Sequence, residues 1–311
     1  MKKVFIDGRA GTTGLRIYQR LEGRQDIDFL SLTEEERKDP ARRAEMLNRA
    51  DVVFLCLPDE AAIEAADMVS NPDTVLIDTS TAHRTSPGWV YGFPELSDSI
   101  RDSIPTARRI AVPGCHASGF IALVRPLVES GLLSPDSRLT CHSVTGYSGG
   151  GKKMISQYQA EGRSTLLDAP RQYGLTQTHK HLREMKALTG LSREPVFCPI
   201  VSDFYSGMVV TVPLFAEDLT GGAGSEDVKA LYRQTYHGPI VHYTDGGGDG
   251  DGFLSAAALS GRDDMEIAVF GNRERILLTA RYDNLGKGAS GAAVEILNLL
   301  LGADPTTGLK V

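Results

Sequence analysis

Residues 3–14, KVFIDGRAGTTG, indicate the fold of this 311-residue chain. The apolar run Lys3–Ile6 predicts a first strand, and a helical pattern of apolar residues follows over Thr13–Leu21. Gly8, Gly11 and Gly14 lie between them and at the start of the helix. Strand, glycine loop and helix in this order are typical of the first turn of a dinucleotide-binding fold.

The rest of the first third repeats the alternation of strand and helix. Helical patterns run to about Ala50 and over Asp59–Val69. Further short apolar runs predict strands at Ile27–Leu32, Val52–Leu57, Val75–Ile77 and Arg109–Val112. Runs without polar alternation are typical of strands buried on both faces, so we expect an α/β fold with a doubly wound parallel sheet.

The pattern of apolar residues changes after residue 114. A helical pattern at Ala117–Val128 is followed by longer strand-like runs at Leu139–Val144, Val196–Val201, Met208–Phe215 and Ile276–Arg281. These runs predict an α+β domain with a mixed or antiparallel sheet. The apolar helical segment Gly288–Leu301 could pack against the first domain. We therefore expect a dinucleotide-binding domain over residues 1–114, completed by 287–311, and a second domain over 115–286.

Composition excludes several classes of protein. The apolar fraction of 41% is ordinary for a globular chain, and the net charge of −7 without a basic stripe argues against binding nucleic acid. No run approaches the ~18 apolar residues of a membrane span. Four cysteines without regular spacing predict reduced thiols, and hence a soluble protein in the cytoplasm.

The glycine loop predicts where a cofactor binds. Gly8, Gly11 and Gly14 would let the backbone approach a pyrophosphate at the helix N-terminus, and Thr12 and Thr13 add hydroxyls. An NAD site usually has a carboxylate at the end of the second strand, to hold the ribose hydroxyls.

The second strand here ends in a hydroxyl instead. Ser31, with Arg37 a few residues later, suits a 2′-phosphate and favours NADP(H), although the acidic residues of Glu34–Glu36 leave NAD open. The alternative interpretation of the glycine loop is a tight turn without a ligand.

Cys115 is the candidate nucleophile. It follows Val112-Pro-Gly at the end of a predicted strand and opens a helix, where free N–H groups and the dipole lower a thiol pKa. Cys56, Cys141 and Cys198 lie inside apolar runs, which is typical of inert core cysteines.

Histidines further along the chain could move the thiol proton. His181 and Glu184 would share one helix face, so the carboxylate could orient the imidazole. His179 lies two residues earlier and would face another way, which argues against a zinc pair. The alternative is a solvated helix start. No metal site is expected at the acidic loop Asp245–Gly252 either, because it lacks the EF-hand pattern.

A second glycine loop could be mistaken for a nucleotide-binding P-loop. Gly146–Lys152 fits that pattern, but Lys153 stands where a magnesium-binding hydroxyl is needed. A loop that shapes the substrate pocket is favoured, with Ser148 and backbone N–H groups as donors.

Several segments together resemble the short-chain type of N-acetyl-γ-glutamyl-phosphate reductase, within the aspartate-semialdehyde-dehydrogenase-like superfamily. The resemblance runs along nearly the whole chain. It is carried by Phe5–Gly14, Leu55–Asp59, Ile77–Arg84, Pro113–Cys115, Ser143–Lys152, His179–His181 and Asp283–Ala293.

The resemblance implies a Rossmann domain that binds NADP over residues 1–114, a catalytic and dimerisation domain over 115–286, and a role in arginine biosynthesis. It also implies a homo-oligomer, a dimer or tetramer. Cys115 matches the catalytic cysteine and His181 the acid/base histidine. The remaining implied residues are Leu57, Pro58 and Asn284 for the cofactor, and Arg84, Ser148, Gly149, Lys152, His179 and Glu184 for the substrate. Val112 and His116 stand where the family motif has Asn and Tyr, so His181, His179 and His116 all remain candidates for the acid/base.

The expected reaction is reduction of N-acetyl-γ-glutamyl phosphate to N-acetyl-L-glutamate 5-semialdehyde, with release of phosphate, through a thioester on Cys115. One alternative is the same chemistry on another acyl phosphate, such as aspartyl phosphate or an acylated aminoadipyl phosphate. The others are a non-catalytic NADP-binding sensor and, with least support, a P-loop phosphotransferase.

Overall fold

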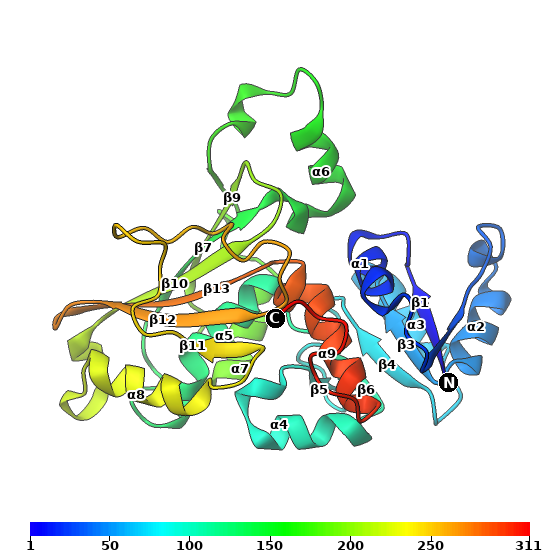
Figure 1. Cartoon of the computed structure of the whole chain (residues 1–311), viewed down its shortest axis with the longest axis horizontal. Helices are drawn as coiled ribbons and strands as arrows, with labels where there is room; N and C mark the ends of the chain where they lie inside the picture. Colours follow the sequence, from blue (N-terminus) through cyan, green and yellow to red (C-terminus); the bar gives the residue numbers. More distant parts are fainter. The chain divides into compact units, whose positions relative to one another are not determined.

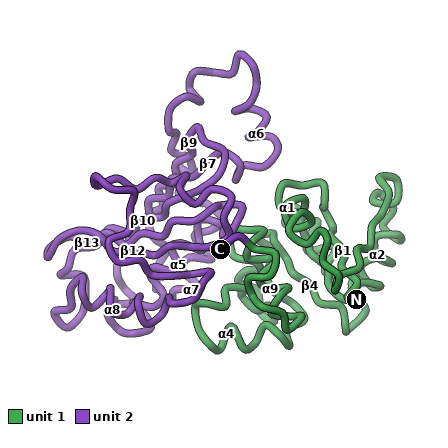
Figure 2. Tube along the Cα trace, viewed as in Figure 1, with its two compact units in different colours: residues 1–113, 289–309 green, residues 114–288, 310–311 purple.

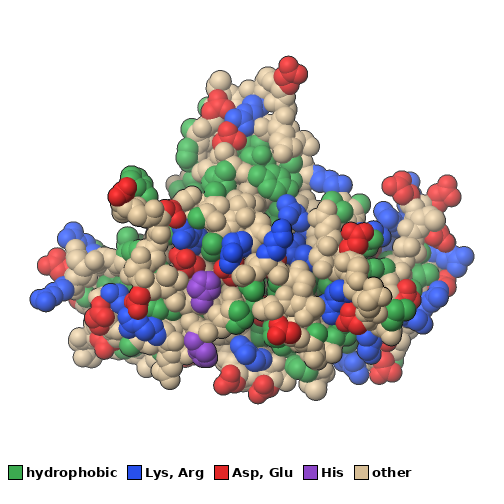
Figure 3. All heavy atoms as spheres, in the orientation of Figure 1, with side chains coloured by type: hydrophobic (Ala, Val, Ile, Leu, Met, Phe, Trp, Pro, Cys, Tyr) green, Lys and Arg blue, Asp and Glu red, His purple; other side chains and the backbone are tan.

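The computed structural model describes residues 1–311, which divide into two compact units (Figure 2). Unit 1 comprises residues 1–113 and 289–309, and unit 2 comprises residues 114–288 and 310–311. No helix is both long enough and apolar enough to cross a membrane. Lys and Arg side chains and Asp and Glu side chains both occur across the face shown in Figure 3.

Unit 1 is built on a six-stranded parallel sheet with the order β2-β1-β3-β4-β6-β5 (Figure 1). Its strands are β1 (Lys2–Asp7), β2 (Ile27–Leu30), β3 (Val52–Leu55), β4 (Val75–Asp78), β5 (Val90–Tyr91) and β6 (Arg109–Ala111). Its helices are α1 (Thr12–Leu21), α2 (Pro40–Arg49), α3 (Asp59–Asp67), α4 (Asp98–Ser103) and α9 (Gly291–Leu300).

Alternate side chains of each strand enter two separate cores. In β3, Val52 and Phe54 join the cluster that includes residues of α1 and α9, whereas Val53 and Leu55 join the cluster with Leu47 of α2. Both faces of the sheet are therefore buried, as the continuous apolar runs predict. The doubly wound parallel sheet is confirmed.

Unit 2 contains a mixed seven-stranded sheet with the order β11-β12-β13-β10-β7-β9-β8. Its strands are β7 (Thr140–Gly146), β8 (Arg171–Gln172), β9 (Val196–Ser202), β10 (Met208–Phe215), β11 (Val241–Tyr243), β12 (Met265–Gly271) and β13 (Arg275–Tyr282). Its helices are α5 (Cys115–Glu129), α6 (Gly151–Gln159), α7 (His181–Thr189) and α8 (Ser225–Thr235). Pairs β7–β9 and β11–β12 are parallel and the other neighbours antiparallel, which confirms the predicted mixed sheet.

Three element boundaries differ from the sequence prediction in ways that matter for the site. The helix expected from Ala117 begins at Cys115, so the candidate nucleophile is its first residue. The strand expected to reach Leu57 ends at Leu55. A short π-helical turn precedes the last helix, which begins at Gly291 and not at Gly288.

Candidate active site

Cys115 lies at the N-terminus of α5, within unit 2. The residue before it, Gly114, adopts an extended conformation and caps the helix without a side-chain hydrogen bond. The backbone comes close on another side too, because a Cβ atom on Gly288 would lie 3.1 Å from the Cβ of Cys115. None of the four cysteines forms a disulfide. A half-buried thiol at a helix N-terminus has the surroundings that favour a thiolate.

Three histidine rings gather next to the nucleophile. The ring centroids of His116 and His181 lie 5.6 Å apart, those of His179 and His181 lie 4.7 Å apart, and those of His116 and His179 lie 5.9 Å apart. His181 is the first residue of α7 and is buried. Its backbone N–H donates to Nδ1 of His179 at 3.2 Å. The fold thus brings all three candidate acid/base residues into one cluster.

His116 is held between two hydroxyl groups. Its Nδ1 is 2.7 Å from Oγ of Ser143, and its Nε2 is 2.7 Å from the hydroxyl of Tyr173. Burial, with a smaller contribution from the positive charge of His179, lowers the pKa of His116 to about 3. His116 is therefore neutral at physiological pH, and both its nitrogens are engaged.

Glu184 is buried on α7, on the same helix as His181. The structure shows Oε1 of Glu184 accepting a hydrogen bond of 2.8 Å from the N–H of Gly114. This carboxylate therefore fixes the turn that leads into Cys115. The orienting contact with His181 that the spacing suggested stays a prediction.

Cys56 and Cys141 are poor nucleophiles. Burial raises the pKa of the Cys56 thiol to about 12, and burial raises the pKa of the Cys141 thiol further. Both thiols stay protonated, as expected of core cysteines.

The glycine loop of unit 1 leaves no room for a side chain at Gly8 or Gly14. Gly8 has φ +86°, and a Cβ there would lie 2.2 Å from the carbonyl oxygen of Cys56. A Cβ on Gly14 would lie 2.7 Å from the oxygen of Gly8, and the N–H of Gly11 donates to that same oxygen at 2.8 Å.

This tight loop opens the first helix of unit 1. No side chain caps α1, and its first turn, which begins with Thr12 and Thr13, carries no acidic residue. Its N-terminal N–H groups therefore suit a phosphate, so the chain fits a dinucleotide here.

Three other expected cofactor residues follow strand ends at the same edge of the parallel sheet. Ser31 follows the C-terminal end of β2, and Leu57 and Pro58 follow that of β3. Ser31 and Arg37 are both exposed, with Arg37 in a short 3-10 turn. Carboxyl ends of parallel strands form the usual ligand edge.

Arg84 belongs to the turn after β4 in unit 1. Its guanidinium donates to the carbonyl oxygens of Val112 and Thr79, at 2.9 and 3.1 Å. In the same turn Nδ1 of His83 lies 2.7 Å from Oδ2 of the buried Asp78. The predicted anion-binding arginine thus also ties its turn to the end of β6.

The second glycine loop is held in place by the side-chain amide of Asn284. Oγ of the buried Ser148 accepts a hydrogen bond of 3.0 Å from Nδ2 of Asn284, whose Oδ1 accepts another from the N–H of Gly207 at 2.9 Å. Gly149 is exposed and packs beside that amide, and Lys152 is exposed in the first turn of α6. Asn284, expected near the cofactor, is here a buried support of this loop.

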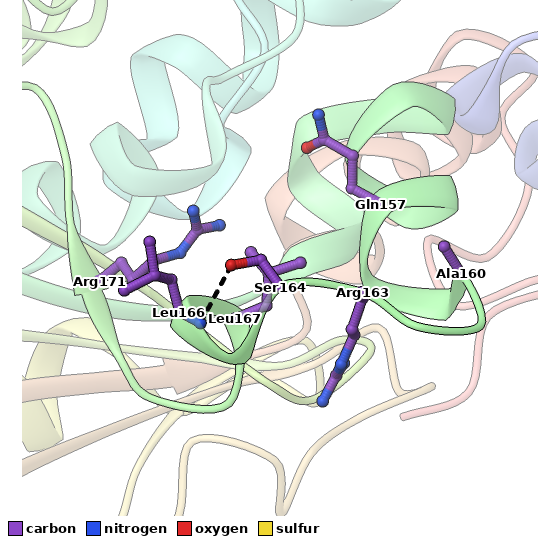
Figure 4. A pocket seen from close by; sticks show the side chains of 7 residues that line it. All are labelled: Gln157, Ala160, Arg163, Ser164, Leu166, Leu167 and Arg171. Atoms are coloured by element: carbon purple, nitrogen blue, oxygen red, sulfur yellow. Dashed lines mark hydrogen bonds between the residues drawn. The ribbon is translucent and has the colours of Figure 1, made fainter.

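A pocket of about 380 Å³ opens beside α6 and contains none of the predicted site residues. Figure 4 shows its lining side chains: Gln157, Ala160, Arg163, Ser164, Leu166, Leu167 and Arg171. Asp168 and Asp203 pair with Arg163, so that charge is already balanced.

Three hydroxyl residues near Cys115 were not predicted. They are Ser143, Tyr173 and Tyr282, from β7, the segment after β8 and the end of β13. No local pattern identifies them, because each reaches the nucleophile helix only through the pairing of distant strands.

Two family models match the chain in the same two parts. "Semialdehyde dehydrogenase, NAD binding domain" matches residues 3–103, and "Semialdehyde dehydrogenase, dimerisation domain" matches residues 115–284. The fold and the thiol site thus define an oxidoreductase of the semialdehyde dehydrogenase class.

Relatives of similar length show which family of this class the chain belongs to. N-acetyl-gamma-glutamyl-phosphate reductase 2 of Nostoc sp. is 44% identical over 318 residues and covers 99% of each chain. The N-acetyl-gamma-glutamyl-phosphate reductase of Chelativorans sp. is 46% identical over 307 residues, covering 96% of this chain and 98% of the relative. The chain therefore belongs to the N-acetyl-gamma-glutamyl-phosphate reductase family, which confirms the resemblance.

Solved structures share the fold at low identity. Aspartate semialdehyde dehydrogenase II from Vibrio cholerae, complexed with ASA, has a TM-score of 0.72 at 15% identity and covers 97% of this chain and 98% of its own. Aspartate semialdehyde dehydrogenase with NADP from Candida albicans has a TM-score of 0.66 at 15% identity, with the same coverage.

Proposed function

We propose that this chain reduces N-acetyl-γ-glutamyl phosphate to N-acetyl-L-glutamate 5-semialdehyde with NADPH, through a thioester on Cys115, in arginine biosynthesis. The observation that carries the proposal is the position of Cys115, as the first residue of α5, beside the cluster of His116, His179 and His181. Full-length relatives named for this reaction support the choice of substrate.

The chain's own residues perform the acyl transfer. The Cys115 thiolate attacks the acyl carbon, and the bond to the phosphate oxygen breaks, so phosphate leaves with its electron pair. N–H groups at the start of α5 stabilise the oxyanion. When bound, NADPH supplies the hydride that reduces the thioester to a hemithioacetal. That hemithioacetal collapses to the aldehyde and releases the thiol.

His181 is the proposed acid/base. It takes the thiol proton and later protonates the oxygen of the hemithioacetal. His116 is unsuited to this work, because a pKa of about 3 makes it too weak a base to take the thiol proton, and its two nitrogens bond Ser143 and Tyr173. His179, half-buried beside His181, is placed at the substrate.

Unit 1 supplies the cofactor site. Gly8, Gly11 and Gly14 with the first turn of α1 hold the pyrophosphate, aided by Thr12 and Thr13. Ser31 and Arg37 hold the 2′-phosphate, which makes NADP(H) the preferred cofactor. Leu57 and Pro58 are assigned the remaining cofactor contacts in this unit. Asn284 belongs to unit 2, where it bonds Ser148, so its expected role beside the cofactor stays a prediction.

Cationic and donor groups hold the substrate. Arg84 is assigned to an anionic group of the substrate, and Lys152 to another. Ser148 and Gly149 shape the pocket, with Glu184 behind the Cys115 turn. Arg84 also holds its own turn, through bonds to the carbonyl oxygens of Thr79 and Val112.

The proposed working form is a homo-oligomer in the cytoplasm. The dimerisation-domain model covers residues 115–284, and the sheet of unit 2 exposes apolar side chains, including Val196 and Leu277. A second copy is the natural cover for such residues. A reducing compartment keeps the Cys115 thiol available for reaction.

The reverse reaction tests this proposal. NADP, phosphate and N-acetylglutamate semialdehyde are mixed with the protein, NADPH is followed by absorbance, and aspartate semialdehyde is the parallel substrate. We expect phosphate-dependent NADPH formation with the acetylated substrate only. Turnover of aspartate semialdehyde alone would move the assignment to another acyl phosphate, and cofactor binding without turnover of either aldehyde would support a sensor.

A further inference from the structure

The Tyr282 hydroxyl bonds two backbone groups in the first turn of the nucleophile helix. In an α-helix the N–H of Gly119 faces the carbonyl of Cys115, four residues earlier. Here the N–H of Gly119 donates to the Tyr282 hydroxyl at 2.9 Å, and that hydroxyl donates to the carbonyl of Cys115. The phenol thus bonds both backbone groups of the turn that carries the nucleophile.

The close approach of the phenol depends on a glycine. A Cβ on Gly119 would lie 2.8 Å from the Tyr282 hydroxyl oxygen and 2.7 Å from Cγ2 of Val210. Gly inside a helix costs about 1 kcal/mol relative to Ala, so its presence here goes with the close approach of α5 to β10 and β13 (Figure 1).

Two other buried tyrosines bond to the same helix in an ordinary way. The hydroxyl of Tyr236 donates to the carbonyl of Ala122 at 2.7 Å, and that of Tyr232 donates to the carbonyl of Leu123. Each holds one carbonyl away from the nucleophile. Tyr282 alone among the three bonds to the carbonyl of Cys115 itself.

We propose that Tyr282 is a positioning residue for the reaction above, whose hydroxyl fixes Cys115 and strengthens the N–H donors around its thiolate. A donor on the Cys115 carbonyl polarises the peptide group shared with His116, so the N–H of His116 becomes a stronger donor. That N–H belongs to the first turn of α5, where N–H groups have no acceptor within the helix.

Tyr282 keeps its proton throughout. Burial, together with the negative charge of a Cys115 thiolate, raises the pKa of Tyr282 well above its usual value. The hydroxyl therefore remains a donor to the Cys115 carbonyl when the thiolate forms.

The test compares Tyr282→Phe with Tyr236→Phe, since each removes one buried hydroxyl that bonds α5. Iodoacetamide alkylation of Cys115 is followed against pH by peptide mass spectrometry, which needs no substrate, and kcat and KM are measured in the reverse reaction. We expect Tyr282→Phe to raise the apparent thiol pKa by about one unit and to lower kcat about tenfold, with KM little changed. Tyr236→Phe should match the wild type in both.

A second variant guards against misfolding of Tyr282→Phe. Gly119→Ala with Val210→Gly keeps Tyr282, removes both Val210 atoms that would collide with the new methyl group, and leaves that methyl 2.8 Å from the Tyr282 hydroxyl oxygen, so the same rise in thiol pKa is expected. If Tyr282→Phe and Tyr236→Phe give the same alkylation profile, Tyr282 is only a helix anchor and the inference is wrong.

The inference rests on the proposed function, but its failure is separable from that of the function. A raised thiol pKa in a protein that turns over neither aldehyde would uphold the positioning role and reject the substrate.

Discussion

His116 and Tyr173 share a hydrogen bond of 2.7 Å between Nε2 and the phenol oxygen. The opposite ring nitrogen of His116 bonds Ser143 at 2.7 Å. The residue directly after the nucleophile is thereby tied to two distant segments of unit 2. The negative charge of a Cys115 thiolate, after burial, also raises the pKa of Tyr173, so the thiol and this network lie close enough to interact.

Acid should destabilise the protein through His116. Its pKa is about 3 in the folded chain, against about 6.5 for an unfolded histidine. Between these values the unfolded chain binds more protons, so the stabilisation is full above about pH 6.5 and is lost as the pH falls toward 3. We expect His116→Gln to flatten the slope of unfolding free energy against pH in this window, by up to about 1.4 kcal/mol per pH unit.

Urea titrations at several pH values measure that slope. His237→Gln, at an exposed histidine, is the control and should leave it unchanged. A slope that His116→Gln also leaves unchanged would show that His116 titrates normally in the folded chain.

Substitutions of His181 and of His179 should affect different kinetic constants. His181→Asn should lower kcat by roughly 100-fold or more, because it removes the general base, while KM changes little. His179→Asn should act mainly on KM. Steady-state kinetics in the reverse direction give both constants, and the opposite pattern would exchange the two roles.

The glycine loop allows a matched test of steric crowding. Gly8 and Gly23 have φ angles of +86° and +84°, but a Cβ would collide with the Cys56 carbonyl only at Gly8. Gly23→Ala should cost about 1–2 kcal/mol, the strain of a positive φ. Gly8→Ala should cost clearly more and weaken NADPH binding. Thermal unfolding and cofactor titration measure both effects, and equal costs would contradict the tight loop.

Cofactor preference should depend on Arg37. Arg37→Ala should raise the KM for NADPH about 10- to 100-fold and leave that for NADH unchanged, because only NADPH carries the 2′-phosphate. Lys38→Ala, at the exposed neighbour, is the control. An equal rise for both cofactors would place the 2′-phosphate elsewhere.

Much of the architecture follows from local patterns. Apolar runs of four to six residues between helices predicted the parallel sheet, because strands buried on both faces need no polar alternation. Strand β12 was not predicted. Its apolar run is only Ile267–Phe270, and the charge of Glu266 just before that run is paired only in the fold, by Arg281 opposite it on β13.

The site was only partly predictable for a related reason. The Pro-Gly-Cys115 turn is local, so the sequence indicates it. Tyr282 reaches α5 because β13 pairs with β10 in a register that sets Tyr282 opposite Met208. Helical spacing predicts a contact between Glu184 and His181. The contact that the structure shows for the Glu184 carboxylate is a hydrogen bond from the N–H of Gly114, in a turn 70 residues away.

The thioester on Cys115 can be detected directly. The protein is mixed with NADP and N-acetylglutamate semialdehyde without phosphate, so that oxidation can proceed but the acyl group cannot leave to phosphate. The thioester mechanism predicts a burst of NADPH stoichiometric with subunits and an acyl adduct on the Cys115 peptide by mass spectrometry. Phosphate should then remove the adduct, and Cys115→Ser should show neither burst nor adduct. Steady phosphate-dependent turnover by Cys115→Ser, with no adduct on the wild type, would contradict the mechanism.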